Sequence, residues 1–165
     1  MKTVRLAFWI TLGASLLCLA AAFLSLGGWR PAFIGLAVGA LWGFLSWKGL
    51  RVNLAGFVGV LALLVWAAVS NLPAGWLLGS MVFLLAAWDL GEFMSHLAAF
   101  EADQVSSLLI TLHLRRLSAV CGAGFVLGGA ALVIQIRLAF EMALLLGLLV
   151  FIGLAGMVRF LRRGL

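Results

Sequence analysis

Long apolar runs, separated by short polar turns, constrain the fold of this chain more than any other feature. Of its 165 residues, 66% are hydrophobic and 10% are charged, whereas soluble domains are about 45–50% apolar. An apolar run of about 20 residues can cross a bilayer as a helix, and a helix satisfies its own backbone hydrogen bonds in lipid. Because the runs are continuous and do not alternate, they argue against a transmembrane barrel. The sequence therefore predicts an all-α integral membrane protein.

Six apolar runs predict six transmembrane helices, which together form a single transmembrane domain. Most of the turns between them are only a few residues long, so consecutive helices should lie antiparallel, as three hairpins. Within the domain, residues 1–165, the predicted spans are residues 6–26, 31–47, 52–70, 74–95, 117–136 and 138–158.

The one long connection, residues 96–116, has an apolar spacing of its own. Its apolar residues recur at intervals of three and four, as on one face of a helix, at Val105, Leu108, Leu109 and Leu112. This spacing predicts a short helical connection between helices 4 and 5, at the inner membrane surface or in the cytoplasm. The alternative is a fifth helix that begins near residue 104 and projects from the bilayer.

The distribution of lysine and arginine predicts the orientation in the membrane. If the N-terminus is cytoplasmic, nine of the eleven basic residues lie at cytoplasmic ends, and Arg30 and Arg137 lie outside. Cytoplasmic loops of membrane proteins carry such an excess, so both termini should face the cytoplasm. The membrane would be the plasma (inner) membrane of a prokaryote. The same placement accounts for the net charge of +6 without a basic patch for nucleic acid. The first run is too long for a signal peptide, which predicts an uncleaved first helix.

Titratable residues gather at the end of the fourth run, in the stretch "AAWDLGEFMSHL". Asp89, Glu92 and His96 are spaced i, i+3 and i+7, which puts them on one face of a helix. The polar residues that precede the fifth run are His113, Arg115 and Arg116. A lone carboxylate at the hydrocarbon edge is costly, so the simplest expectation is an ion pair from Asp89 or Glu92 to one of the arginines.

Three other uses of this polar cluster stay open. Asp89 and Glu92 could bind a proton or a cation, as acids in transporters do. A metal site would draw on the two acids and the two histidines, but their spacing matches no known ligand signature. An enzyme would have its site at the inner face, around Glu92, His96 and His113. The sequence contains no phosphate loop, nucleophile elbow or zinc-protease motif, and we predict no cofactor.

Glycines recur at intervals of four residues in two of the runs. Such spacing strips one helix face of side chains and lets another backbone approach closely. The residues concerned are Gly35, Gly39, Gly43, Gly124 and Gly128. They predict either close packing inside the bundle or a seam between copies.

These features predict a polytopic membrane protein that acts as a non-catalytic assembly or scaffold subunit. Its partners would be the lipid bilayer and either its own copies, as a homo-oligomer, or the other subunits of a larger membrane complex. The alternatives are a small-solute or ion- or proton-coupled transporter that uses Asp89 and Glu92, and the membrane enzyme described above.

Overall fold

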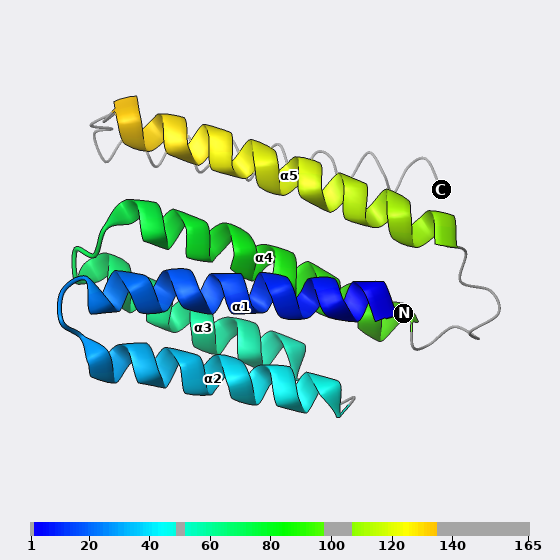
Figure 1. Cartoon of the computed structure of the whole chain (residues 1–165), viewed down its shortest axis with the longest axis horizontal. Coiled ribbons are helices and arrows are strands. Elements are labelled where there is room, and N and C mark those ends of the chain that lie inside the picture. The colour runs from blue at the N-terminus through cyan, green and yellow to red at the C-terminus, as the bar shows by residue number, and fades with distance from the viewer. Residues whose placement is uncertain (1, 49–51, 98–106, 135–165) are drawn as a thin grey trace, which may run out of the picture. The chain divides into compact units, whose positions relative to one another are not determined.

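The computed structural model describes residues 2–48, 52–97 and 107–134, and every element among them is an α-helix. Its five helices belong to one compact unit, Met1–Val133. Figure 1 shows these helices lying side by side along their lengths. They are α1 (Lys2–Leu24), α2 (Trp29–Trp47), α3 (Asn53–Val69), α4 (Ala74–Leu97) and α5 (Ser107–Ile134).

The prediction of six membrane spans is wrong. Among the described residues, three helices are long and apolar enough to cross a membrane: Thr3–Leu24, Ala74–Leu97 and Leu108–Val133. At 1.5 Å per residue, the 17 residues of α3 reach only about 25 Å, less than the roughly 30 Å of a hydrocarbon core. Helix α2, with 19 residues and Arg30 in its first turn, is not among the three. Three candidate spans still indicate an integral membrane protein.

The connection between the fourth and fifth helices also differs from the expectation. Helix α5 begins at Ser107, so the stretch predicted as a separate short helix is the first part of α5. Residues 107–116 contain neither glycine nor proline, and nothing in them stops a helix from continuing. The sixth predicted span, residues 138–158, lies outside the described residues.

Two helices end in a residue with left-handed backbone geometry. Gly27 has φ 73° after α1, and Asn71 has φ 57° after α3. In each turn a backbone N–H reaches back across the helix end, from Gly28 to the Phe23 carbonyl and from Leu72 to the Ala67 carbonyl. Glycine and asparagine tolerate this geometry best, which explains where the chain reverses.

The glycines of α2 receive side chains of α1. A Cβ atom at Gly39 would overlap the side chain of Leu16, and one at Gly43 would meet the Trp9 ring. A Cβ atom at Gly35 would make ordinary van der Waals contact with Leu19, 3.5 Å away. In this structure the small-residue face of α2 therefore serves the contact between α1 and α2.

The interior of the unit is built around α1, which packs against α2 and α4 while α3 closes the other side. The Trp42 ring fits over Gly56 and meets Phe8 edge-on, with ring centroids 5.9 Å apart. A buried polar contact ties α1 to α4, because the Ser15 hydroxyl donates to the Ser80 carbonyl at 2.9 Å. Pairing matters here, since an unpaired buried hydroxyl is costly.

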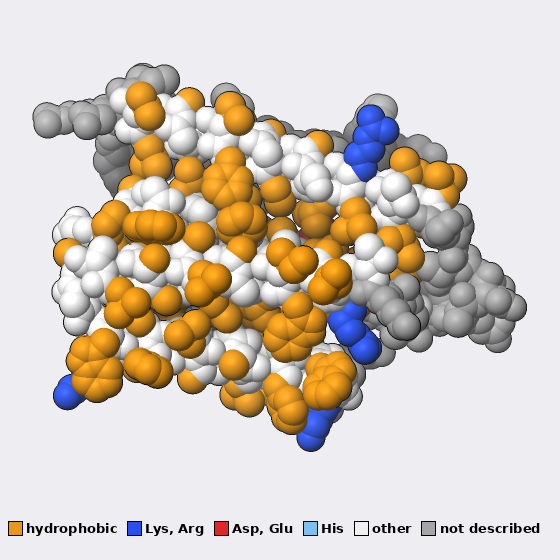
Figure 2. Space-filling model, in the orientation of Figure 1, with side chains coloured by type: hydrophobic (Ala, Val, Ile, Leu, Met, Phe, Trp, Pro, Cys, Tyr) orange, Lys and Arg blue, Asp and Glu red, His pale blue; other side chains and the backbone are white. Residues whose placement is uncertain are grey.

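Helix α5 is the least enclosed element of the unit. None of residues 108–133 is fully buried, whereas α1 and α4 both contribute buried residues to the core. Figure 2 shows hydrophobic side chains spread over the visible face of the described helices. Such exposure suits a helix in contact with lipid, because lipid tails solvate apolar side chains.

Candidate functional site

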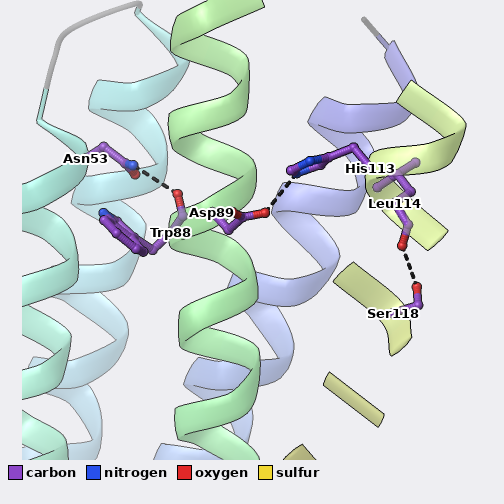
Figure 3. Close-up of polar contacts among 6 residues, drawn as sticks. All are labelled: Asn53, Trp88, Asp89, His113, Leu114 and Ser118. Atoms are coloured by element: carbon purple, nitrogen blue, oxygen red, sulfur yellow. Dashed lines mark hydrogen bonds and ion pairs between the residues drawn. The ribbon is translucent and has the colours of Figure 1, made fainter. Parts of the chain in front are cut away.

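The two acids near the end of α4 face different helices. Asp89 Oδ2 lies 2.8 Å from His113 Nε2 on α5, and Glu92 Oε1 accepts a hydrogen bond of 3.1 Å from Asn53 Nδ2 on α3. In Figure 3, Asp89 points toward α5 while Asn53 approaches α4 from the opposite side. A spacing of three residues leaves the two side chains about 60° apart around the helix axis, and this offset is enough to aim one carboxylate at α5 and the other at α3.

Two side chains contact the imidazole of His113, one on its face and one at its edge. The Phe93 ring stacks on it, with centroids 4.0 Å apart and planes 10° from parallel, and Asp89 meets its edge. Asp89 and Phe93 are four residues apart, so they share one face of α4. The contact with Asp89 has ion-pair distance, although the ring nitrogen is not aligned for a hydrogen bond. We call Asp89, Phe93 and His113 the clamp.

The clamp lies within two of the candidate spans. Asp89 stands eight residues before Leu97, the end of α4, or roughly 12 Å along the helix. His113 stands five residues after the start of the α5 span, Leu108. Neither side chain is sealed off, since 27% of His113 and 43% of Asp89 is exposed. The pair is therefore a partly accessible ionisable site at membrane depth.

Glu92 belongs to a separate contact between α3 and α4. Asn53 Nδ2 donates both to the Trp88 carbonyl and to Glu92 Oε1, each at 3.1 Å. The Ser95 hydroxyl donates to the Glu92 carbonyl at 2.8 Å. Asn53 fits here because position 91 is glycine, and a Cβ atom at Gly91 would overlap the Asn53 amide. The Glu92 carboxylate thus fastens the first turn of α3 to α4.

The remaining predicted residues take no part in either contact. His96 is exposed in the last turn of α4, and Arg115 and Arg116 are exposed on α5. No ion pair joins either arginine to an acid among the described residues. The carboxylate–arginine pair that we expected is therefore not what this structure shows, because Asp89 meets His113 instead.

One sequence signal does single out His113. The residues of α5 that pack against the core follow the helical spacing of Ile110, Leu114 and Leu117. His113 is three residues after Ile110 and four before Leu117, so it lies on the same side of α5. Arg115 and Arg116 are exposed.

Comparison of the chain with models of known protein families, with curated proteins and with solved structures finds no match. The site has to be interpreted from its own chemistry.

A carboxylate beside an imidazole can exchange a proton, and Asp89 and His113 are such a pair. The described residues contain no group of three or more histidine, cysteine, aspartate or glutamate side chains placed to hold a metal ion. Asp89 and His113 are together, but Glu92 turns toward Asn53. The enzyme at the inner face stays a prediction.

The second contact between α4 and α5 is apolar and involves the predicted glycines. A Cβ atom at Gly128 would lie 2.5 Å from Leu78 Cδ1, and one at Gly124 would lie 3.7 Å from Val82 Cγ2. The rings of Phe83 and Phe125 pack beside them, with centroids 5.3 Å apart. We call this contact, between Leu78, Val82 and Phe83 of α4 and Gly124, Phe125 and Gly128 of α5, the notch.

Proposed function

We propose that this protein binds and releases a proton at the clamp, as part of a proton-coupled transport activity in the membrane. One observation carries the proposal: a carboxylate and an imidazole lie 2.8 Å apart on two helices that are each long and apolar enough to span a bilayer. Ionisable side chains at this depth are expensive and rare, and where they occur they mark ion and proton paths.

Because the partner of Asp89 is a histidine and not an arginine, a proton site is favoured over a permanent ion pair. Arginine stays protonated under all physiological conditions, so a pair with arginine would be permanent. Histidine gains and loses a proton near neutral pH. When the imidazole is protonated and Asp89 is ionised, the pair carries no net charge, which lowers the cost of holding it in a medium of low dielectric constant. The face of the Phe93 ring adds a cation–π contact for the imidazolium.

The proposed setting is the plasma membrane of a prokaryote, with the N-terminus in the cytoplasm. Arg5 on α1 and Lys48 at the end of α2 mark this side, because cytoplasmic ends carry the excess of basic residues. Asp89 would then lie about 12 Å from the cytoplasmic end of α4, within reach of protons from that side.

Proton movement in proteoliposomes tests the proposal. A pH-sensitive dye trapped inside reports proton entry after the external medium is acidified. We expect the reconstituted wild-type protein to exceed empty liposomes, and Asp89→Asn and His113→Gln to return to the empty-liposome rate. Glu92→Gln is the matched control, because it also removes a carboxylate from α4 but one that Asn53 holds. Loss of flux in the control with retention in Asp89→Asn would refute the proposal.

Proton binding has a readout that does not depend on flux. The chain contains two histidines, so His96→Gln leaves the ring nitrogens of His113 as the one histidine signal in a nitrogen-15 spectrum. We expect the chemical shifts of these ring nitrogens to change once Asp89 is changed to Asn, because the carboxylate lies 2.8 Å from Nε2. Identical shifts in both proteins would mean that Asp89 does not share a proton with His113.

A second candidate function is the assembly subunit predicted from the sequence, and the exposure of α5 favours it. Gly122 and Gly129 on this helix have open space where a Cβ atom would be, and small residues let a second helix approach closely. The mass of the complex in lipid nanodiscs tests this function. Gly122→Leu should reduce any oligomer or heteromer to single chains, whereas a wild-type protein that is already a single chain would exclude it.

A further inference from the structure

The contacts between α4 and α5 are of two kinds, and they lie at different positions along the two helices. The notch is apolar and lies toward the Ile134 end of α5, while the clamp is ionic and aromatic and lies toward the Ser107 end. His113 and Gly124 are eleven residues apart, or roughly 16 Å along the helix. The two contacts can therefore change independently.

The notch is held together by close packing of apolar side chains. The Leu78 side chain occupies the space that a Cβ atom at Gly128 would need, and Val82 packs at Gly124. Contacts of this type depend on van der Waals packing. No member of the notch carries a charge, so a change in protonation leaves it unaltered.

The clamp holds through charge. Its ion pair exists while Asp89 is ionised and His113 is protonated, and the loss of either charge removes the attraction. The other titratable or charged groups described on α4 and α5 are Glu92, His96, Arg115, Arg116 and Cys121. Glu92 is held by Asn53, and His96 and the two arginines are exposed. The neutral thiol of Cys121 carries no positive charge and does not replace the imidazolium.

We infer that α5 pivots about the notch, and that the clamp is the contact that opens and closes. Proton gain by Asp89, or proton loss by His113, would separate α4 from α5 at the Ser107 end and leave the Ile134 end in place. The inference rests on the proposed function for its trigger, since it makes proton binding the event that moves the helix. Beyond the proposed function, the inference states that the Ser107 end of α5 moves and that the notch stays fixed.

Two distances between spin labels test the inference in the full-length protein in nanodiscs. With Cys18 and Cys121 changed to alanine, one pair of labels at Ser95 and Leu112 reports the clamp end. A second pair at Ala74 and Ala131 reports the notch end, and all four positions are exposed. Pulsed electron resonance then gives the distribution of each distance.

We expect Asp89→Asn to lengthen or broaden the Ser95–Leu112 distance and to leave the Ala74–Ala131 distance unchanged. Asp89→Glu, which keeps the charge, should restore the wild-type distribution at the clamp end. Gly128→Leu should do the reverse of Asp89→Asn and move the notch end. Equal changes at both ends, or no change at either end in Asp89→Asn, would overturn the inference.

A pH series on the labelled protein with an intact clamp covers the case in which a clamp variant fails to fold. A change of pH in either direction that removes one of the two charges should lengthen the Ser95–Leu112 distance alone, and an unchanged distance throughout would overturn the inference. The proposed function fails separately: opening of the clamp end in Asp89→Asn, together with no proton flux through the wild-type protein in liposomes, would support the pivot and refute the transport activity.

Discussion

Asp89 Oδ2 and His113 Nε2 lie 2.8 Å apart and join the last turns of α4 to the first turns of α5. The contact links two helices that residues 98–106 separate in sequence. It places a proton donor and a proton acceptor side by side in the apolar part of the chain, and Phe93 fixes the plane of the imidazole. Three of the predictions below concern the polar and glycine contacts of the helices, and one concerns their orientation.

The clamp should show a measurable coupling free energy. In a double-mutant cycle of Asp89→Asn and His113→Gln, we expect a coupling of about 0.5–1.5 kcal/mol, because both side chains are partly exposed and polar contacts between membrane helices average below 1 kcal/mol. Unfolding in a lipid–detergent mixture gives the free energies. Strict additivity of the two substitutions would show that the residues do not interact.

Replacing Asn53 should destabilise the contact between α3 and α4. Asn53→Ala removes the donor to Glu92 and to the Trp88 carbonyl, and a typical hydrogen bond contributes about 0.5–1.5 kcal/mol. The same unfolding measurement applies. Ser95→Ala is the control and should cost less, because its hydroxyl is exposed and bonds chiefly within α4. A larger loss in Ser95→Ala than in Asn53→Ala would contradict this account.

The glycines of α2 should not tolerate a side chain. Gly39→Leu would force Leu16 out of its place, and overpacking of this kind costs about 1–3 kcal/mol. Gly13→Ala is the matched control, because nothing lies within 4 Å of its Cβ position, and in a helix alanine is favoured over glycine by about 0.5–1 kcal/mol. Stability should fall in the first variant and stay level or rise in the second.

Labelling of introduced cysteines should report the orientation of the chain. In a Cys18→Ala/Cys121→Ala background, Arg5→Cys should resist a membrane-impermeant maleimide added outside intact cells, and Asn71→Cys should react. Asn71 is exposed in the turn after α3, at the end of the unit opposite Arg5. The reverse pattern of labelling would place the N-terminus outside and contradict the charge distribution as a guide to topology.

The error in the number of spans has a physical origin. Six apolar runs are visible in the sequence, but a run only becomes a span if its helix is long enough for the hydrocarbon core. Helix α3 stops at Val69 because Asn71 takes up a left-handed backbone conformation there. Hydrophobicity shows where helices form, while the backbone geometry of the turns decides their length.

The partner of Asp89 could not be read from spacing alone. Residues 113, 115 and 116 all fall near the level of Asp89 in an antiparallel hairpin, and the choice among them depends on the rotation of α5 about its axis. Packing of Leu114 and Leu117 against the core sets that rotation. It turns His113 toward α4 and leaves the two arginines exposed.

By itself the sequence determined the all-α class, the membrane environment and the glycine positions, because these follow from apolar content and from the absence of side chains. Only the tertiary structure decided which helix each polar group faces. Asp89 and Glu92 are three residues apart, yet one bonds to α5 and the other to α3. That division depends on where neighbouring helices sit around α4, which is a property of packing and not of any local pattern of residues.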